Sequence, residues 1–117
     1  MKIIVSRSGN LVILSEQKNA IVPAGSSIYL PSESGIDISK YRYKTISFYG
    51  DYTGLTYSVE VSDDGSFTDY PPLYEGTLDA DTLESPTFEA DFKYVRVKIE
   101  NPDTSDHTIK TFRVKGR

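Results

Sequence analysis

The residues of this chain that could do chemistry are few, and they lie in turn segments. The only histidine, His107, follows Asp103, Thr104 and Ser105. An imidazole near a hydroxyl and a carboxylate is the set that nucleophilic catalysis uses, but these residue types are also ordinary turn formers. No nucleophile-elbow sequence or glycine-rich phosphate loop accompanies them, and no carboxylate pair is singled out. We therefore expect no catalytic residue and no enzyme.

Oxygen ligands for a hard cation occur in two places. Asp79, Asp81 and Glu84 lie close together in sequence, and Asp63-Asp64-Gly65 supplies further carboxylates. Neither segment matches an EF-hand loop, and a solvated loop and an Asp-Gly hairpin turn explain them without calcium. The chain has no cysteine, which excludes disulfides, thiolate zinc sites and cysteine nucleophiles. We expect no bound metal and no cofactor.

The elements that must position these residues are β-strands. Apolar or alternating segments recur about every ten residues between turn signals, which is the spacing of a sandwich or barrel. In chain order they are Leu11 to Leu14, Ser26 to Leu30, Tyr43 to Tyr49, Thr56 to Ser62, Lys93 to Glu100 and Thr108 to Lys115. No window keeps an apolar face at helical spacing, so helix is limited to short turns such as Asp37 to Tyr41. The pattern predicts an all-β fold, a two-sheet antiparallel β-sandwich that is jelly-roll-like, with about eight strands.

Alternation within these strands predicts the core. The inward residues are expected to be Val59, Val61, Val95, Val97, Ile99, Phe112 and Val114. Ile109 is out of phase with Phe112, which predicts a β-bulge or bend near Lys110-Thr111. Asp64-Gly65 is predicted to close a hairpin with Gly65 at positive φ. The polar stretch from Tyr74 to Pro86 is expected to connect the two sheets.

The length and the hydropathy of the chain set its organisation. At 117 residues, one domain over residues 1–117 is expected. No stretch approaches the roughly 18 apolar residues of a membrane span. Near the N-terminus only Ile3, Ile4 and Val5 precede Ser6 and Arg7, which is short of a signal-peptide apolar region. We expect a chain folded in the cytoplasm, and an extracellular or cell-surface location is the alternative if a leader has been removed.

The charge is unevenly distributed along the chain. The net charge is −4, from 13 bases and 17 acids, and the pI is about 4.9. Every charged residue between Thr45 and Phe92 is acidic, whereas bases concentrate from Lys93 to Arg117. An acidic domain is a poor binder of polyanions, so nucleic acid is not expected as a partner.

The interface candidates follow from this distribution. If the last two strands form a hairpin, Arg96 and Lys98 lie beside Arg113 and Lys115. We expect these four bases to meet an acidic protein surface, either a neighbouring copy or a lattice protein. Tyr49 and Tyr52 are further candidates, because tyrosine offers rigid apolar area with a polar tip to a protein or a sugar.

Two segments carry a family resemblance. SVEVSDDGSFTDY, Ser58 to Tyr70, and FKYVRVKIEN, Phe92 to Asn101, resemble the hairpin and penultimate strand of discoidin-like, galactose-binding-type jelly rolls. In that pattern a strand ends in Ser-x-Asp-Gly, an aromatic follows, and an aromatic-Val-Arg strand returns across the sheet. The resemblance covers Tyr43 to Lys115. It implies that Ser62, Asp64, Gly65, Phe67, Tyr94 and Arg96 are scaffold positions and not ligand contacts.

Three functions remain open. The first is a structural protein of a viral particle, such as a capsid-decorating or tail-associated protein, because similar segments occur in small structural proteins of bacterial and archaeal viruses. The second is a carbohydrate-binding module, which the resemblance favours and the absence of tryptophan disfavours. The third is an accessory domain of a larger surface protein. We favour the first, with assembly into a homo-oligomer or a capsid or tail lattice and a location in the virion.

Overall fold

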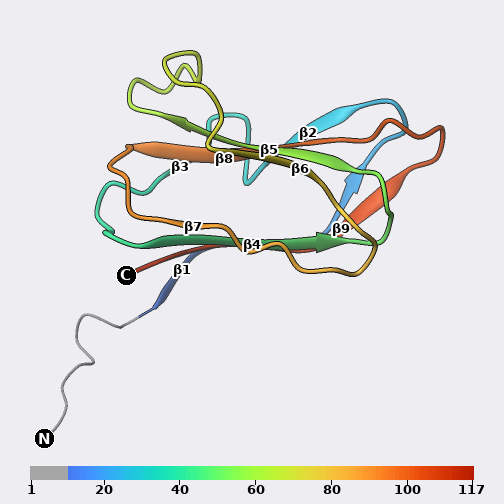
Figure 1. Cartoon of the computed structure of the whole chain (residues 1–117), viewed down its shortest axis with the longest axis horizontal. Coiled ribbons are helices and arrows are strands. Elements are labelled where there is room, and N and C mark those ends of the chain that lie inside the picture. Colours follow the sequence, from blue (N-terminus) through green and yellow to red (C-terminus); the bar gives the residue numbers. More distant parts are fainter. Residues whose placement is uncertain (1–10) are drawn as a thin grey trace, which may run out of the picture.

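The chain folds as a sandwich of two antiparallel sheets, shown as two layers in Figure 1. The computed structural model describes residues 11–117, and Ile3 to Val5, on which the expectation of a missing leader rests, lie outside them. Nine strands and no helix are present within residues 11–117, and nothing there could therefore span a membrane as a helix. The predicted all-β sandwich is confirmed.

The strand order is that of a jelly roll. One sheet has the order β1 (Val12–Val22), β9 (His107–Gly116), β4 (Lys44–Gly50) and β7 (Thr87–Phe88). The other has the order β2 (Ser27–Leu30), β8 (Tyr94–Glu100), β5 (Thr56–Ser62) and β6 (Tyr74–Thr77), and β3 (Ile36–Asp37) also pairs with β8. Because β2 and β3 both pair with β8, they act as one interrupted strand. This agrees with the prediction of about eight strands.

The core lies between the two sheets. All seven residues predicted to face inward are buried: Val59, Val61, Val95, Val97, Ile99, Phe112 and Val114. Ile46 and Phe48 of β4 are also buried in this core, and the centroids of the Phe48 and Phe112 rings are 6.2 Å apart. The predicted connection between the sheets is confirmed for residues 78–86, which join β6 in one sheet to β7 in the other. The prediction was wrong for Tyr74–Thr77, which form strand β6.

The last strand contains the predicted bulge. Tyr49 pairs with Thr111, but the next residue of β4, Gly50, pairs with Ile109, so Lys110 is the extra residue of β9. The bulge shifts the phase of the strand by one residue. Ile109 and Phe112 are therefore both buried despite their odd spacing.

The loop after β5 differs from the prediction in part. Gly65 has a φ of 85°, as predicted. However, β5 ends at Ser62 and its partner β6 begins at Tyr74, so residues 63–73 form a long loop and Asp64-Gly65 does not close a tight hairpin. β6 has the sequence YEGT and no apolar alternation, so the sequence pattern could not show where the loop ends.

The last two strands do not form the hairpin on which the expected cluster of Arg96, Lys98, Arg113 and Lys115 depended. β8 lies in one sheet and β9 in the other, and residues 101–106 cross between them. The buried side chain of Asn101 holds this crossing, because its amide donates to the carbonyls of Val22 and Ser105 at 2.9 and 2.8 Å. Both strands point their apolar residues into one core from opposite sides. Their charged faces therefore point away from each other.

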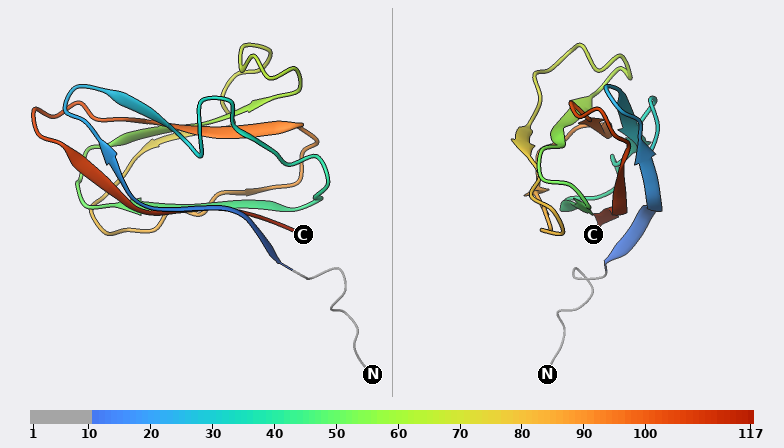
Figure 2. Two further views of the ribbon diagram at one scale, coloured as in Figure 1. Left: turned by 180° about the vertical axis from the view of Figure 1, so that it is seen from behind. Right: turned by 90° about the vertical axis from the view of Figure 1, so that its right-hand side faces the viewer.

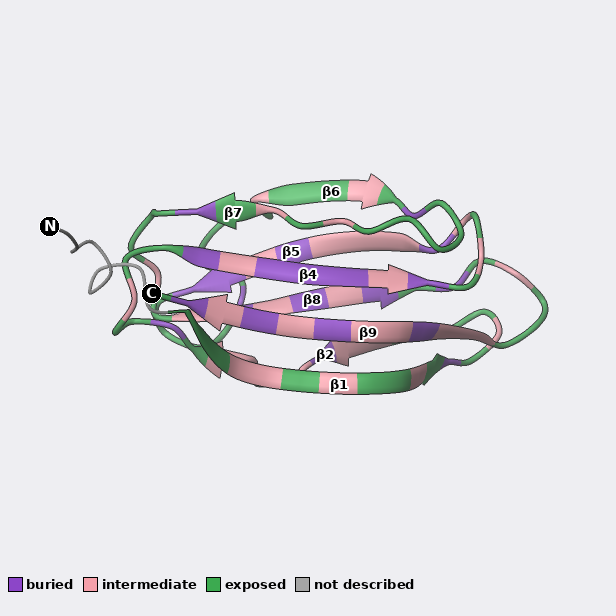
Figure 3. Cartoon of the chain, turned by 90° about the horizontal axis from the view of Figure 1, so that it is seen from below, coloured by how far each residue is buried: buried purple, intermediate pink, exposed green. Residues whose placement is uncertain are grey.

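The first strand is longer than predicted. The apolar run Leu11 to Leu14 is its beginning, and β1 continues through polar residues to Val22. It pairs with β9 along this whole length, and Figure 2 shows the two strands side by side in both views. Figure 3 shows β1 at the edge of its sheet, with exposed residues along much of its length. A polar edge strand lacks the alternation that identifies a buried one.

Candidate functional site

The structure gathers three of the six predicted interface residues on one surface. Tyr49, Arg113 and Lys115 lie on the outer face of the β1-β9-β4-β7 sheet, where register places Tyr49 opposite Thr111 and Arg113 opposite Ser47. Lys18 lies beside Thr111 on the same face. We call this surface the outer basic face and define it by Lys18, Tyr49, Thr111, Arg113 and Lys115. Figure 3 views the molecule from this side.

The charge on the outer basic face is partly neutralised within the chain. The guanidinium of Arg113 donates to the carboxylate of Glu16 on β1, and this contact holds the pKa of Glu16 below its usual value. Lys18 and Lys115 form no ion pair with any described residue. The face therefore keeps a positive charge that a partner could meet.

Hydroxyl pairs border the face on its β7 side. Thr45 and Thr87 lie 2.9 Å apart between hydroxyl oxygens, and Ser47 and Ser85 lie 3.0 Å apart. These contacts join β4 to the segment at the sheet edge. The surface beside Arg113 and Lys115 is thus polar and is fixed by its own hydrogen bonds.

Arg96 does not belong to this face. It lies on the opposite sheet, where hydrogen bonds and two aromatic rings hold its side chain. Its Nε donates to Glu60 at 2.7 Å and its Nη1 donates to the carbonyl of Glu33 at 2.6 Å. The guanidinium lies between the rings of Tyr29 and Phe67, 4.0 and 4.2 Å from their centroids. Its side chain is only 13% exposed. Arg96 is a scaffold residue here, as the family resemblance implied.

The other motif residues of the resemblance build the loop that carries Phe67. The hydroxyl of Ser62 accepts from the backbone nitrogens of Gly65 and Phe67 at 3.0 and 3.2 Å. The carboxylate of Asp64 accepts from the backbone and hydroxyl of Ser66, and these hydrogen bonds lower the pKa of Asp64. The loop therefore positions the buried ring of Phe67 against the guanidinium of Arg96, which is the scaffold role that the resemblance implies.

Lys98 and Tyr52 are also away from the outer basic face. Lys98 lies on the outer face of the opposite sheet, 3.8 Å from the Glu100 carboxylate. Tyr52 packs against the core and stacks on the ring of His107, with 3.7 Å between centroids and 9° between planes. The six predicted interface residues therefore do not form one cluster. They lie on the outer faces of both sheets and, for Tyr52, at one end of the sandwich.

His107 is held by carboxylates. Its Nε2 lies 2.7 Å from Asp103, and its Nδ1 lies 3.9 Å from Asp51. The hydrogen bond with His107 lowers the pKa of the Asp103 carboxyl. Within residues 11–117 neither ring nitrogen contacts the hydroxyl of Ser105 or any other serine. The Tyr52 ring and the two carboxylates thus hold the imidazole of His107 at the end of the crossing between β8 and β9.

The candidate calcium ligands have partners of their own. Asp81 accepts from the Lys110 ammonium at 2.7 Å, which raises the pKa of Lys110. Glu84 accepts from the hydroxyl of Tyr57 at 3.2 Å. In the described part of the chain no three histidines or carboxylates come together as a metal site.

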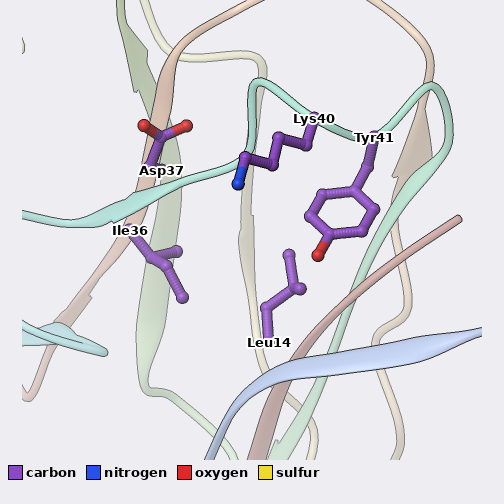
Figure 4. A pocket seen from close by; sticks show the side chains of 5 residues that line it. All are labelled: Leu14, Ile36, Asp37, Lys40 and Tyr41. Atoms are coloured by element: carbon purple, nitrogen blue, oxygen red, sulfur yellow. The ribbon is translucent and has the colours of Figure 1, made fainter.

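The hollows of the surface are small and open. One of about 270 Å³ lies at the open side between β1 and β3, lined by Leu14, Ile36, Asp37, Lys40 and Tyr41 (Figure 4). The Asp37 carboxylate is already engaged by the backbone and hydroxyl of Ser39, which lower its pKa. Another hollow, of about 230 Å³, is lined by Ser39, Asp63, Asp91, Phe92 and Lys93.

Comparison with known proteins supports the fold and no more. No family model matches the sequence, and no curated protein matches it. The chain shares its fold with the PBSX exported protein XepA. The TM-score is 0.63 at 18% identity, over 99% of this chain and 39% of that one, so the chain spans about two fifths of XepA.

Two further solved structures are similar to a lower degree. The Yersinia pseudotuberculosis-derived mitogen gives a TM-score of 0.57 at 8% identity, over 92% of this chain and 86% of that one. The C-terminal CBM6 of the laminarinase LamC from Zobellia galactanivorans gives 0.49 at 14%, over 90% and 98%. The β-sandwich fold is shared with XepA and with the mitogen, and the discoidin-like resemblance stays an interpretation.

One buried cation was missed from the sequence. Lys44 is 1% exposed, and its ammonium donates to the carbonyls of Ala90, Arg42 and Glu89 at 2.9, 3.4 and 3.4 Å. Burial lowers its pKa, although nearby carboxylates act in the opposite direction. Its spacing from Ile46 and Phe48 is the signal that could have found it, because residues two apart share one side of a strand.

Proposed function

We propose that this chain is a non-enzymatic assembly module, and most specifically a structural protein of a viral particle, of the capsid-decorating or tail-associated kind. The outer basic face carries the proposal. It is a polar sheet surface on which Lys18 and Lys115 have no ion-pair partner among the described residues. Such a surface suits docking on an acidic protein lattice, where charge complementarity sets orientation and the association rate.

The fold likeness supports this role without establishing it. The phage exported protein XepA has the same fold over nearly the whole of this chain. Location in the virion, and a partner in the capsid or tail, are parts of the proposal. The absence of enzyme activity is likewise proposed, because the described imidazole is held between a tyrosine ring and carboxylates rather than beside a nucleophile.

Charge reversal on the outer basic face tests the docking surface. Arg113→Glu together with Lys115→Glu removes two bases and adds two acids on one face. Tagged protein would be sedimented with purified particles of the source virus at low and moderate salt. The parent should co-sediment less as the Debye length falls below ~10 Å, and the double variant should fail to co-sediment even at low salt.

A matched double variant controls for net charge. Lys93→Glu together with Lys98→Glu makes the same charge change away from the outer basic face, just before β8 and on the outer side of the opposite sheet, and it should leave co-sedimentation unchanged. Both variants would be checked for parental circular dichroism. Equal binding by the two folded variants would contradict the docking surface, and failure to find the chain in purified particles by mass spectrometry would contradict the viral role.

Carbohydrate binding is the second candidate, and one hollow favours it. Phe92 is half-buried beside Asp63, Asp91 and Lys93, and the ring of the exposed Tyr70 meets it edge-on at 5.1 Å. An aromatic beside carboxylates is a pairing that can stack on a sugar and bind its hydroxyls. Glycan-array binding that is lost in Phe92→Ala would support this function. An array without signal would remove it.

A further inference from the structure

The first strand leaves one edge of the sandwich open. β1 ends the order of its sheet, and no described strand lies beyond it. Its residues Val12, Ile13 and Ile21 have large apolar side chains that are 43 to 60% exposed. An edge strand presents unpaired backbone groups, and exposed apolar residues on such an edge favour pairing with another strand.

The outward side chains of β1 are arranged symmetrically. Pairing with β9 places Ile13 beside Lys115, Glu16 beside Arg113 and Lys18 beside Thr111, all on the outer side of the sheet. A register shift between Ile13 and Ser15, and the positive φ of Asn19, change the phase of the strand on both sides of its middle. The outward row is therefore Ile13, Glu16, Lys18 and Ile21, all of them exposed, and it is symmetric about Gln17.

The same centre makes the strand sequence self-complementary. Reversed about Gln17, VILSEQKNAIV places Val12 on Val22, Ile13 on Ile21, Leu14 on Ala20, Ser15 on Asn19 and Glu16 on Lys18. Two copies related by a two-fold axis at Gln17 would thus match Ile13 with Ile21 and Glu16 with Lys18 on the outward side. Val22, Leu14 and Ala20 face the protein's own core and keep the same pattern on the inward side. An isologous interface requires this relation, in which residue i meets j and j meets i.

We propose that a second copy of this chain pairs antiparallel with β1, with the two-fold axis at Gln17, and joins the two four-stranded sheets into one continuous sheet. The backbone ladder supplies the attraction. The pairs Ile13 with Ile21 and Glu16 with Lys18 of the second copy set the register, because directly opposite side chains interact most strongly across antiparallel strands. A one-residue slip would place Glu16 away from Lys18.

The centre of β1 is held in place for this contact. The side-chain amide of Gln17 donates to the carbonyl of Pro31 at 2.8 Å, which ties the middle of the strand to the segment after β2. The hydrogen bond from Arg113 fixes the Glu16 carboxylate. The edge is therefore a rigid template, and pairing costs little ordering of these side chains.

The proposed pairing joins two copies of this chain through β1, and it does not depend on binding to a viral particle. A chain that pairs through β1 but binds no particle would refute the proposed function and leave this pairing intact. A chain that binds particles as a monomer would do the reverse.

Cysteine cross-linking tests the register directly, because the parent chain has no cysteine. Directly opposite residues of antiparallel strands lie about 4.5–5.5 Å apart between Cα atoms, within disulfide range. Ile13→Cys and Ile21→Cys would be made on chains with tags of different size, mixed, and oxidised mildly. The mixture should form a covalent heterodimer, whereas either variant alone should not, since two copies of position 13 lie about 26 Å apart in this pairing.

An exposed site elsewhere controls for random collision. Leu83 is 59% exposed and lies outside β1, so Leu83→Cys mixed with Ile13→Cys should give only background dimer. Heterodimer yield no higher than this background would overturn the pairing. Equal yield from Ile13→Cys alone would also overturn it, because that result requires a different register.

Charge exchange gives a second test that does not depend on cysteine. Lys18→Glu places two acids opposite each other twice per dimer, and it should weaken self-association roughly tenfold in sedimentation equilibrium. Glu16→Lys should weaken it similarly. An equimolar mixture of the two variants should recover parental association, because each acid again meets a base. Failure of the mixture to associate, or assembly of the parent into rings or filaments larger than a dimer, would contradict the two-fold pairing.

Discussion

Replacing Arg96 should destabilise the fold much more than replacing its exposed neighbours. The guanidinium fills a slot between Tyr29 and Phe67 and is bonded to Glu60 and to the Glu33 carbonyl. Arg96→Ala removes two aromatic contacts, each worth about 0.5–1 kcal/mol. It also leaves Glu60, whose side chain is 20% exposed, without its ion-pair partner. The unpaired carboxylate adds about 1–3 kcal/mol.

The expected loss is therefore about 3 kcal/mol of unfolding free energy, out of a total of ~5–15 kcal/mol for a domain of this kind. Arg96→Lys should lose about half as much, since lysine keeps the charge but neither the flat stacking surface nor the forked donors. Urea unfolding followed by circular dichroism would measure both values, provided that the slope of the transition is unchanged.

The control lies on the same strand. Lys98 points to the same side of β8 as Arg96, and its only ion pair with a described residue is to Glu100, at 3.8 Å. Lys98→Ala should cost less than about 0.5 kcal/mol. A double-mutant cycle with Glu60→Gln would isolate the ion pair from the stacking. If Arg96→Ala proved as mild as Lys98→Ala, Arg96 would not be a scaffold residue, and the interface interpretation from the sequence would return.

Three further outcomes are expected. Val97→Asp should prevent folding, because it places an unpaired carboxylate in a fully buried position; a cooperative melt like the parent's would contradict the core assignment. Gly65→Val should cost about 1 kcal/mol or more in thermal unfolding, because of its φ of 85° rather than a clash, since a Cβ there would lie 3.8 Å from the Tyr94 ring. The lowered pKa of Asp103 means that its contribution to stability is full above the unfolded value of about 3.9 and is lost as the pH falls through the lower folded value. Asp103→Asn should therefore flatten the acid limb of stability against pH, and an unchanged limb would show that His107 does not hold this carboxyl.

The strands that were predicted well are those buried on one side. β5, β8 and the end of β9 alternate regularly, so their inward residues could be assigned from period two alone. The bulge at Lys110 was also predictable, since Ile109 and Phe112 can both be buried only if the strand gains a residue. The length of β1 was not predictable, because its polar middle at the sheet edge carries no buried face to set a period.

The candidate site was predicted only in part, for a reason that lies in the pairing of strands. Which residues are basic, and which of them point outward, follows from the sequence. Whether Arg96 and Arg113 share a face depends on whether β8 and β9 form a hairpin or an arch between sheets, and both connections satisfy the same alternation.

The sequence by itself determined the fold class, the inward residues of the regularly alternating strands and the turn conformation at Gly65, because each depends on local stereochemistry and on the burial of apolar area. The tertiary structure alone decided that β9 pairs with β1 and β4, which backbone carbonyls accept from the Lys44 ammonium, and that Arg96 is held between two rings. These facts are decided by partners distant in sequence. A side chain's neighbours across a sandwich are set by sheet order, and no local pattern encodes that order.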